Sequence, residues 1–281
     1  MDDSALDAQS RMDFGAARLK AFFRDALAFL LGRRNDLLSF EEVRGRLHIG
    51  GPIYRGLKTV RVDQIVGSVN RYRDFDRAFL PTQNYTADRW LKINRAFYRD
   101  VSLPPVMLYK VGEVYFVVDG NHRVSVAREM GQDYIDAEVR ECAVRVPLSP
   151  DVRAEDLEIL GERVNFLERT ALDKLRPEAT IELTILGGYE RMLEHIAMLK
   201  YFMGADLRQD IGDEEAVTHW YDTVYAPLVD SIRKSGIVEK FPKRTEGDLY
   251  LWVIDHQHYL REGQPGVTPE QAADHFVETI N

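Results

Sequence analysis

The chain of 281 residues contains a single cysteine, Cys142, and no run of 18 or more apolar residues. One cysteine excludes an intrachain disulfide bond and is typical of a reducing compartment. Without a long apolar run no membrane-spanning helix is expected, and the acidic start Met1-Asp2-Asp3 does not resemble a signal peptide. These absences predict a soluble protein of the cytoplasm that does not contact a membrane.

Clustered metal ligands are also missing. The closest pair of histidines, His256 and His258, is two residues apart and therefore does not share a helical face. With one cysteine and no histidines at zinc-finger spacing, a structural zinc site is not expected. The second half likewise contains no helix-turn-helix pattern with a basic recognition helix. Nothing in the sequence indicates an oligomeric state.

Positive charge is scarce in the second half of the chain. Residues 1–140 hold 22 lysines and arginines against 19 acidic residues, whereas residues 141–281 hold 15 against 27. The net charge of −9 thus combines +3 with −12. Because an acidic surface repels the phosphates of DNA, DNA is a less favoured partner than a small molecule.

Residues 114–131 carry the most informative pattern of the sequence. Five apolar residues, 114–118, predict a buried strand. Asp119 and Gly120 interrupt it, and apolar residues at helical spacing then predict a helix that ends at Gly131. The pattern predicts a strand, a glycine turn and a helix, as found in many α/β proteins.

The polar residues at this turn indicate anion binding. The first N–H groups of a helix have no partner within the helix and attract anions, phosphate above all. Arg123 can add a bidentate contact and His122 a donor that depends on pH. The structural alternative is that Asp119 only caps the helix. Five consecutive polar or glycine residues are more than a structural turn requires, which favours phosphate binding.

The segment Asp119-Gly120-Asn121-His122-Arg123 resembles the D-G-x-H-R signature of the ParB/sulfiredoxin-like superfamily. Leu103-Pro104-Pro105-Val106 matches the P-P-[IV] before the preceding strand, and Thr59–Ile65 resembles the opening strand and its turn. The resemblance spans roughly residues 58–140. It implies a small mixed-sheet domain that binds ATP or ADP, or alternatively CTP.

The loop of this chain differs from that of two groups within the superfamily, which narrows the activities that the resemblance implies. Sulfiredoxins carry their catalytic cysteine at the position of Asn121, so repair of a sulfinic acid through a thiolate is not expected. The chromosome-partitioning members use a G-E-R-R loop instead. The loop of this chain resembles that of the free-serine kinases, which implies a phosphotransferase that uses ATP or ADP and Mg²⁺ on a small hydroxyl metabolite. The alternative is a ParB-like binding module or DNA-associated regulator whose nucleotide state controls a partner without catalysis.

The candidate site residues fall into two groups. Asp119 is the first candidate for general base and for the magnesium ligand, with Asp63 and Asp74 as alternatives. Positively charged and polar residues are expected to hold the phosphates: Gly120, Asn121, His122, Arg123, Arg71, Arg73, Arg89 and Lys92. The alternation of arginine and aspartate in residues 71–77 also fits a self-paired loop.

An α+β fold is expected, with three parts. Residues 1–57 form an N-terminal helical extension, 58–146 the ParB/sulfiredoxin-like domain, and 147–281 a mainly helical domain. The amphipathic helix expected at 15–31 should pack its apolar side on the core. In the last part we expect a strand at 181–186 and the following helices: 154–175, 188–203, 213–225, 245–260 and 268–279.

Overall fold

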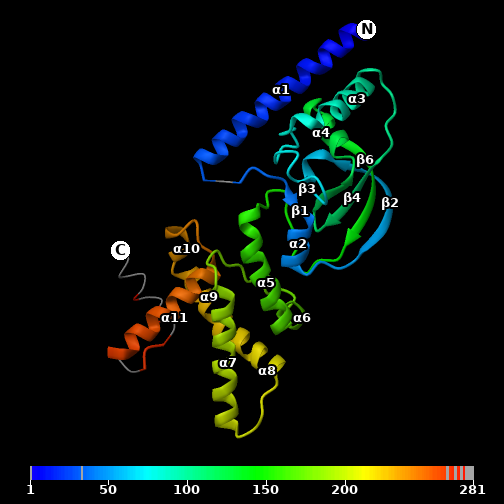
Figure 1. The fold of residues 1–281 in the computed structure, drawn as a ribbon. Coiled ribbons are helices and arrows are strands. Elements are labelled where there is room, and N and C mark those ends of the chain that lie inside the picture. The colour runs from blue at the N-terminus through cyan, green and yellow to red at the C-terminus, as the bar shows by residue number, and fades with distance from the viewer. Residues whose placement is uncertain (1, 33, 264–265, 269–270, 273–274, 276–281) are drawn as a thin grey trace. The chain divides into compact units, whose positions relative to one another are not determined.

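The computed structural model describes residues 2–32, 34–263, 266–268, 271–272 and 275. The chain divides into two compact units, Met1–Leu157 and Glu158–Asn281. The first contains a mixed sheet with helices and the second is helical, which confirms the α+β class (Figure 1). From the sequence we expected a separate N-terminal extension, residues 1–57, and a domain boundary after residue 146. In the structure the first unit includes residues 1–57 and extends to Leu157.

A six-stranded mixed sheet forms the centre of the first unit. The strand order across the sheet is β1 (Leu38–Ser39), β3 (Ile65–Ser68), β5 (Val114–Asp119), β4 (Val106–Val111), β6 (Tyr134–Cys142) and β2 (Pro52–Arg61). The β1/β3, β3/β5 and β4/β6 pairs are parallel, and the β4/β5 and β6/β2 pairs are antiparallel. The strand expected at residues 114–118 is therefore confirmed as β5.

The opening strand is longer than expected and lies at the edge of the sheet. β2 begins at Pro52 rather than Thr59, because its first half pairs with the end of β6. A bulge between Tyr54 and Leu57 interrupts this pairing, and Gly56 lies there with a φ of 85°. A 3-10 turn, Val62–Gln64, then leads into β3.

Helices cover both faces of the sheet. Phe40 of α2 (Phe40–Leu47) packs against the rings of Tyr109 and Phe116 on one face. Val124 of α4 (Asn121–Glu129) belongs to the apolar core on the other face. Ser39 caps the start of α2, since its hydroxyl accepts from the Glu42 amide.

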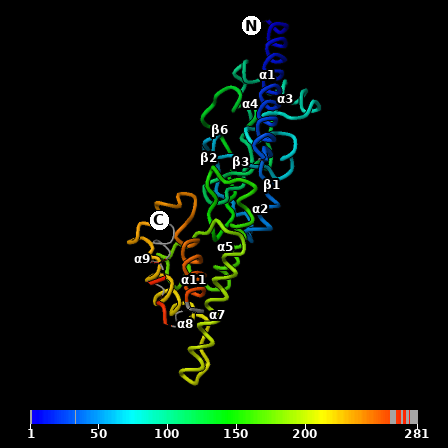
Figure 2. The backbone as a smooth tube through the Cα atoms, turned by 90° about the vertical axis from the view of Figure 1, so that its left-hand side faces the viewer, coloured from blue at the N-terminus to red at the C-terminus, as the bar shows by residue number. Residues whose placement is uncertain are grey.

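Two further helices, α1 (Asp3–Leu30) and α3 (Ala87–Tyr98), pack beside α4 (Figure 2). Trp90 anchors them, because it is fully buried and its indole nitrogen donates to the Ser125 hydroxyl at 3.0 Å. Ala17 and Ala21 of α1 lie in the same apolar cluster. Small residues on this side let α1 approach the body of the unit closely.

The expectation that the apolar stripe of α1 packs on the core is wrong. Large side chains along the helix are exposed instead: Met12, Leu19, Phe22, Phe23, Leu27, Phe29, Leu30 and Leu31. The buried side is formed by Leu6, Ser10, Ala17 and Ala21. The helix is therefore apolar on two opposite sides, and its large residues lie on the outer one.

The second unit is a helical bundle around one apolar core. Its helices are α5 (Leu157–Thr170), α6 (Leu172–Leu175), α7 (Gly188–Leu207), α8 (Asp213–Trp220), α9 (Ala226–Lys234), α10 (Ile237–Lys240) and α11 (Glu246–Gly263). A π-helical segment, Tyr221–Tyr225, joins α8 to α9. The core centres on Tyr250, whose hydroxyl is 3.1 Å from both His195 Nδ1 and Trp220 Nε1.

One expectation for this unit is wrong, and another concerns residues that the structure largely does not describe. Residues 181–186 do not form a strand. Ile181 and Leu183 enter the core, and the Thr184 amide donates to buried Asp248 instead of to a neighbouring strand. The helix expected at 268–279 lies largely outside the described residues. Within the described part of the chain, no helix has the length and apolar character needed to cross a membrane.

Candidate functional site

The turn between β5 and α4 depends on Gly120. Its φ is 109°, a left-handed conformation that other residues rarely adopt. A Cβ atom there would lie 2.6 Å from Val106 Cγ1 and 3.1 Å from Arg123 Nε. The glycine thus allows both the turn and the close approach of β4.

The helix start behind this glycine has no side-chain cap. The N-cap residue is Gly120, and Asp119 does not cap the helix as the structural alternative proposed. The Asp119 carboxylate instead accepts from Arg123 Nη2 at 2.6 Å. The N–H groups of the first turn of α4 are therefore left for another acceptor.

Two side chains of this turn are buried with unpartnered polar atoms. Asn121 and His122 are each 5% exposed. Neither Asn121 Oδ1 nor His122 Nδ1 has a hydrogen-bond partner. Buried polar atoms without partners are rare in proteins because each one costs roughly 1–3 kcal/mol. Their presence beside an uncapped helix start indicates a place for a polar ligand.

These atoms border a small hollow with positively charged walls. Its volume is about 30 Å³, and its lining comprises Arg71, Arg89, Ile93, Asp119, Gly120, Asn121, His122 and Arg123. Burial, together with Arg71 and Arg89, lowers the pKa of His122 to about 4, although Asp74 opposes this shift. The imidazole is therefore neutral at pH 7. The hollow has room for the outer oxygens of one phosphate group.

Arg123 holds the turn in place. Its Nη1 donates to the carbonyl oxygens of Pro104 and Pro105, the latter at 2.9 Å, and its Nη2 donates to Asp119. Only 12% of its side chain is exposed. The bidentate contact with phosphate expected for Arg123 is thus replaced by contacts that brace the loop before β4.

The arginine-rich segment after β3 is largely self-paired. Arg71 Nη1 donates to Asp74 at 3.0 Å, and the Tyr85 hydroxyl also donates to Asp74. Asp76 is buried, where it accepts from Arg24 at 3.0 Å and from backbone amides. Only Arg71 of the arginines in this segment reaches the hollow.

Several predicted site residues lie elsewhere. Arg73 is exposed over the ring of Tyr72, 5.5 Å from its centroid, and does not line the hollow. Lys92 is exposed and also does not line it, whereas Arg89 on the same helix does. Asp63 pairs with Arg61 at the wall of a different cavity.

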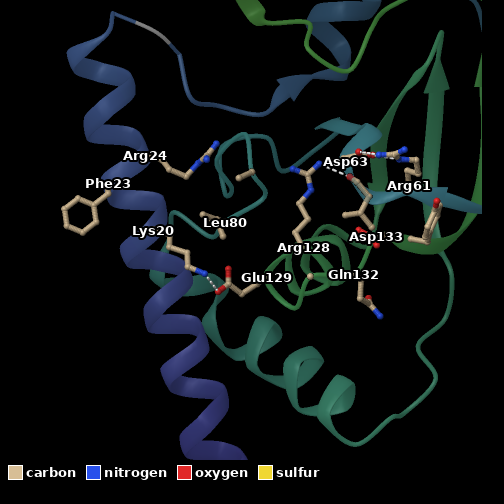
Figure 3. A pocket seen from close by; sticks show the side chains of 14 residues that line it. Lys20, Phe23, Arg24, Arg61, Asp63, Leu80, Arg128, Glu129, Gln132 and Asp133 are labelled. Carbon is tan, nitrogen blue, oxygen red and sulfur yellow. Dashed lines mark hydrogen bonds and ion pairs between the residues drawn. The ribbon is translucent and has the colours of Figure 1, made fainter.

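That cavity, of about 1020 Å³, lies between α1 and the segments around α4 (Figure 3). Its charged walls are paired: Lys20 with Glu129 at 2.6 Å and Arg61 with Asp63. Arg128 donates to the carbonyl oxygens of Val62 and Ile65. Since these groups contact one another, this cavity is a weaker candidate for an anion than the small hollow.

Sequence reasoning missed two residues of the site. Ile93 of α3 lines the hollow beside Arg89, one helical turn away. The Phe75 ring contacts the edge of His122, with ring centroids 5.3 Å apart. Phe75 was visible as an aromatic residue among arginines, but its contact with His122 joins residues far apart in the sequence.

A second cavity adjoins the hollow. It has a volume of about 450 Å³ and shares Ile93 and Arg123 with the hollow. The loop Ser102–Pro105 and the side of β6 at Asp136 form other parts of its wall. Small-molecule sites have volumes of about 300–1,000 Å³, so this cavity is large enough for the remainder of a phosphate-bearing ligand.

Among the described residues, no group of three or more His, Cys, Asp or Glu could hold a metal ion. Mg²⁺, however, is commonly bound through one or two carboxylates together with substrate phosphates. Asp119 has 56% of its side chain exposed at the edge of the hollow. A single carboxylate at this place fits a phosphate-bound magnesium ion but not a site formed by protein alone.

Comparison with known proteins adds little to this geometry. No protein-family model and no curated protein matches the chain. A solved structure of a Pnob8-like ParB-N domain aligns with 82% of this chain and 83% of its own. The identity is 10% and the TM-score is 0.22. A TM-score this low supports no conclusion about fold or function.

Proposed function

We propose that the turn before α4 binds the phosphate groups of a nucleotide, and that the chain transfers a phosphoryl group from ATP or ADP to a small hydroxyl metabolite. The observation that carries the proposal is the pair of buried, unpartnered polar atoms on Asn121 and His122 beside an uncapped helix start. A bound phosphate accepts from the free amides at the start of α4 and from His122 when Nδ1 carries the proton, and it is favoured by the dipole of α4. Asn121 Oδ1 is an acceptor and is satisfied by a donor of the ligand, such as a hydroxyl group.

The proposal assigns each charged group a distinct role. Arg71 and Arg89 neutralise phosphate charge from the walls of the hollow. Arg123 positions the turn through its contacts with Asp119 and the carbonyl oxygen of Pro105. The cavity of about 450 Å³ takes the parts of the ligands that are not phosphate.

Asp119 accepts the proton of the attacking hydroxyl in this proposal. Its carboxylate lies at the edge of the hollow and is exposed, so it is accessible to an acceptor. A magnesium ion held by Asp119 and the phosphates would neutralise the charge that develops during transfer. Asp74 is the weaker candidate, because Arg71 and Tyr85 already occupy its carboxylate.

One observation favours a second function. Both carboxylates near the hollow are engaged by arginines, Asp119 by Arg123 and Asp74 by Arg71. A site that binds a nucleotide without transferring its phosphoryl group needs no free carboxylate as general base. The second candidate is therefore a nucleotide-controlled binding module without catalysis, in which occupancy of the hollow controls a partner.

Nucleotide binding is tested first by thermal unfolding with ATP, ADP, CTP and GTP, each with Mg²⁺. A nucleotide at 100 times its Kd stabilises the folded chain by about 2.7 kcal/mol and raises the melting temperature. Arg89→Gln should weaken binding by roughly 10- to 100-fold, the loss of one charge-assisted contact. Lys92→Gln is the matched control, since Lys92 is exposed on the same helix and does not line the hollow.

Catalysis is tested on a panel of hydroxyl metabolites with the nucleotide that binds. Phosphorylated product that disappears in Asp119→Asn, with nucleotide binding retained, supports the transferase. Binding without turnover supports the binding module. If no nucleotide changes the melting temperature, or if both the Arg89 and Lys92 variants bind like the wild type, the phosphate site itself is refuted.

A further inference from the structure

The outer side of α1 carries an apolar face with one charged residue, Arg11, at its margin. At 100° per residue, this face contains positions three and four apart along the helix: Ala5, Ala8, Met12, Gly15, Ala16, Leu19, Phe22, Phe23, Ala26, Leu27, Phe29 and Leu30. Charged residues flank it. Figure 3 shows Lys20 and Arg24 pointing toward the neighbouring cavity. Phe23 also belongs to the rim of this cavity, and its ring points away from the unit.

The exposed area of this face is large for a surface that remains in water. Its large side chains are between 56% and 85% exposed when Leu31, at its end, is included. With about 200 Å² for a large apolar side chain, eight of them expose on the order of 1,000 Å². The largest apolar patch on a typical monomer measures about 300–600 Å², and a stable interface buries about 800 Å² on each partner.

Small and large residues are segregated along the face. The first half carries Ala5, Ala8, Gly15 and Ala16 with Met12 as its one large residue, and the second half carries Leu19, Phe22, Phe23, Leu27, Phe29 and Leu30 with Ala26 as its one small residue. A parallel pair of such helices would place bulky residues against bulky residues and leave gaps at the other end. An antiparallel pair places the bulky half of one helix on the small half of the other, which gives close packing along the whole length.

We infer that the partner of this face is α1 of a second copy of the chain, related by a two-fold axis and antiparallel. The pairing that places Ala16 of one copy opposite Leu19 of the other extends by the heptad spacing to three further pairs: Met12 with Phe23, Ala8 with Leu27, and Ala5 with Leu30. Three of the four combine a small residue with a large one. The face is self-complementary, as a two-fold interface requires.

The dimer is tested by measuring the mass of the full chain in solution by light scattering across a range of concentrations. The wild type should have twice the 32.4 kDa mass of a single chain. Leu19→Glu, at the centre of the face, should return it to a single chain. Leu57→Glu is the matched control, because Leu57 is 62% exposed on β2 and Leu19 is 57% exposed on α1. The control variant should remain a dimer, and circular dichroism checks that both variants keep the helical content of the wild type.

The orientation is tested with engineered cysteines, since native Cys142 is buried. A mixture of Ala8→Cys and Leu27→Cys chains should form a disulfide between copies. Ala8→Cys alone should not, because the two Ala8 positions lie roughly 28 Å apart at 1.5 Å per residue, beyond the reach of a disulfide. Cross-linking of Ala8→Cys with itself would show a parallel pair and overturn the antiparallel pairing.

Other partners for the face give different results in the same measurements. A monomeric wild type at all concentrations overturns the proposal. A dimer that survives Leu19→Glu places the interface elsewhere. Binding of the chain as a monomer to vesicles of phosphatidylcholine and phosphatidylserine, lost in Leu19→Glu, would assign the face to a lipid surface instead.

Discussion

Acidification should destabilise the first unit through His122. Burial, followed by Arg71 and Arg89, lowers the pKa of this imidazole to about 4 from its ordinary value of 6.5. In the unfolded chain the residue takes up a proton as the pH falls through 6.5, whereas the folded chain resists protonation until about pH 4. The free energy of unfolding therefore falls between these values, by about 3 kcal/mol in total at ~1.4 kcal/mol per pH unit. Above pH 6.5 His122 makes no contribution to the pH dependence.

The assay compares urea unfolding of the wild type and His122→Gln at pH 7, 5.5 and 4. Hydrogen exchange of the segment 114–131 identifies the transition of the first unit. Glutamine has a similar volume and does not titrate, so the variant should lack this part of the pH dependence. Other titrating groups affect both proteins equally. If the two proteins lose stability in parallel from pH 7 to pH 4, His122 is not held neutral by its surroundings and the reasoning fails.

An anion in the hollow should reverse the shift. A unit negative charge about 4 Å from the imidazole contributes roughly 4 kcal/mol at an effective dielectric constant of 20, equivalent to about 3 pKa units. Sulfate is a suitable probe because its charge is constant over this pH range. Its Kd should fall by about tenfold or more between pH 7.5 and pH 5, and the NMR titration of His122 should move to higher pH. A pKa of His122 that is unchanged by saturating sulfate would exclude an anion at this turn.

Three further predictions concern positions where the structure leaves little freedom. Gly120→Ala should lower the free energy of unfolding by about 3 kcal/mol in urea titrations, because it combines a left-handed φ with a 2.6 Å approach to Val106. Asp248→Ala should cost about 3 kcal/mol in the second unit, because the fully buried carboxylate accepts from the Thr184 amide at 2.9 Å and from its hydroxyl at 2.5 Å. Cys142 should resist alkylation by iodoacetamide at pH 8 until the chain is denatured, because burial raises the pKa of its thiol.

The central strand, turn and helix could be predicted from the sequence because their determinants are local. The apolar run before Asp119, the glycine at the turn and Gly131 at the end of α4 act over a few residues each. The structure confirms all three, with Gly120 and Gly131 both at positive φ. Local patterns are therefore sufficient to indicate the candidate turn, without information on long-range contacts.

The misassigned elements depend on contacts between distant residues. The apolar residues of α1 predicted burial, but periodicity cannot show which of two apolar sides faces the unit, and Ala17 and Ala21 proved to be the inner ones. Residues 181–186 have the composition of a strand but no neighbouring strand to pair with. Their amide at Thr184 bonds to Asp248 instead, 64 residues away.

The choice between Arg89 and Lys92 shows the same limit within one helix. Both are basic, three residues apart and exposed. Only the rotation of α3 decides which one reaches the hollow, and that rotation is fixed by buried Trp90 and its bond to Ser125. From the sequence, Arg89 and Lys92 are equally good candidates for the phosphate site. The packing of α3 brings only Arg89 to the hollow.

The bulged edge strand β2 also bears on solubility. An open sheet edge invites another chain to add a strand, and a flat, regular edge is the most vulnerable. On β2 the first residue, Pro52, has no amide hydrogen to offer, and the bulge at Tyr54–Leu57 breaks the ladder. Three basic side chains lie along the strand: Arg55, which pairs with Glu141, Lys58, and Arg61, which pairs with Asp63. An incoming strand would meet a ladder broken at the bulge and would have to bury these charged side chains, both of which disfavour the addition of a strand at this edge.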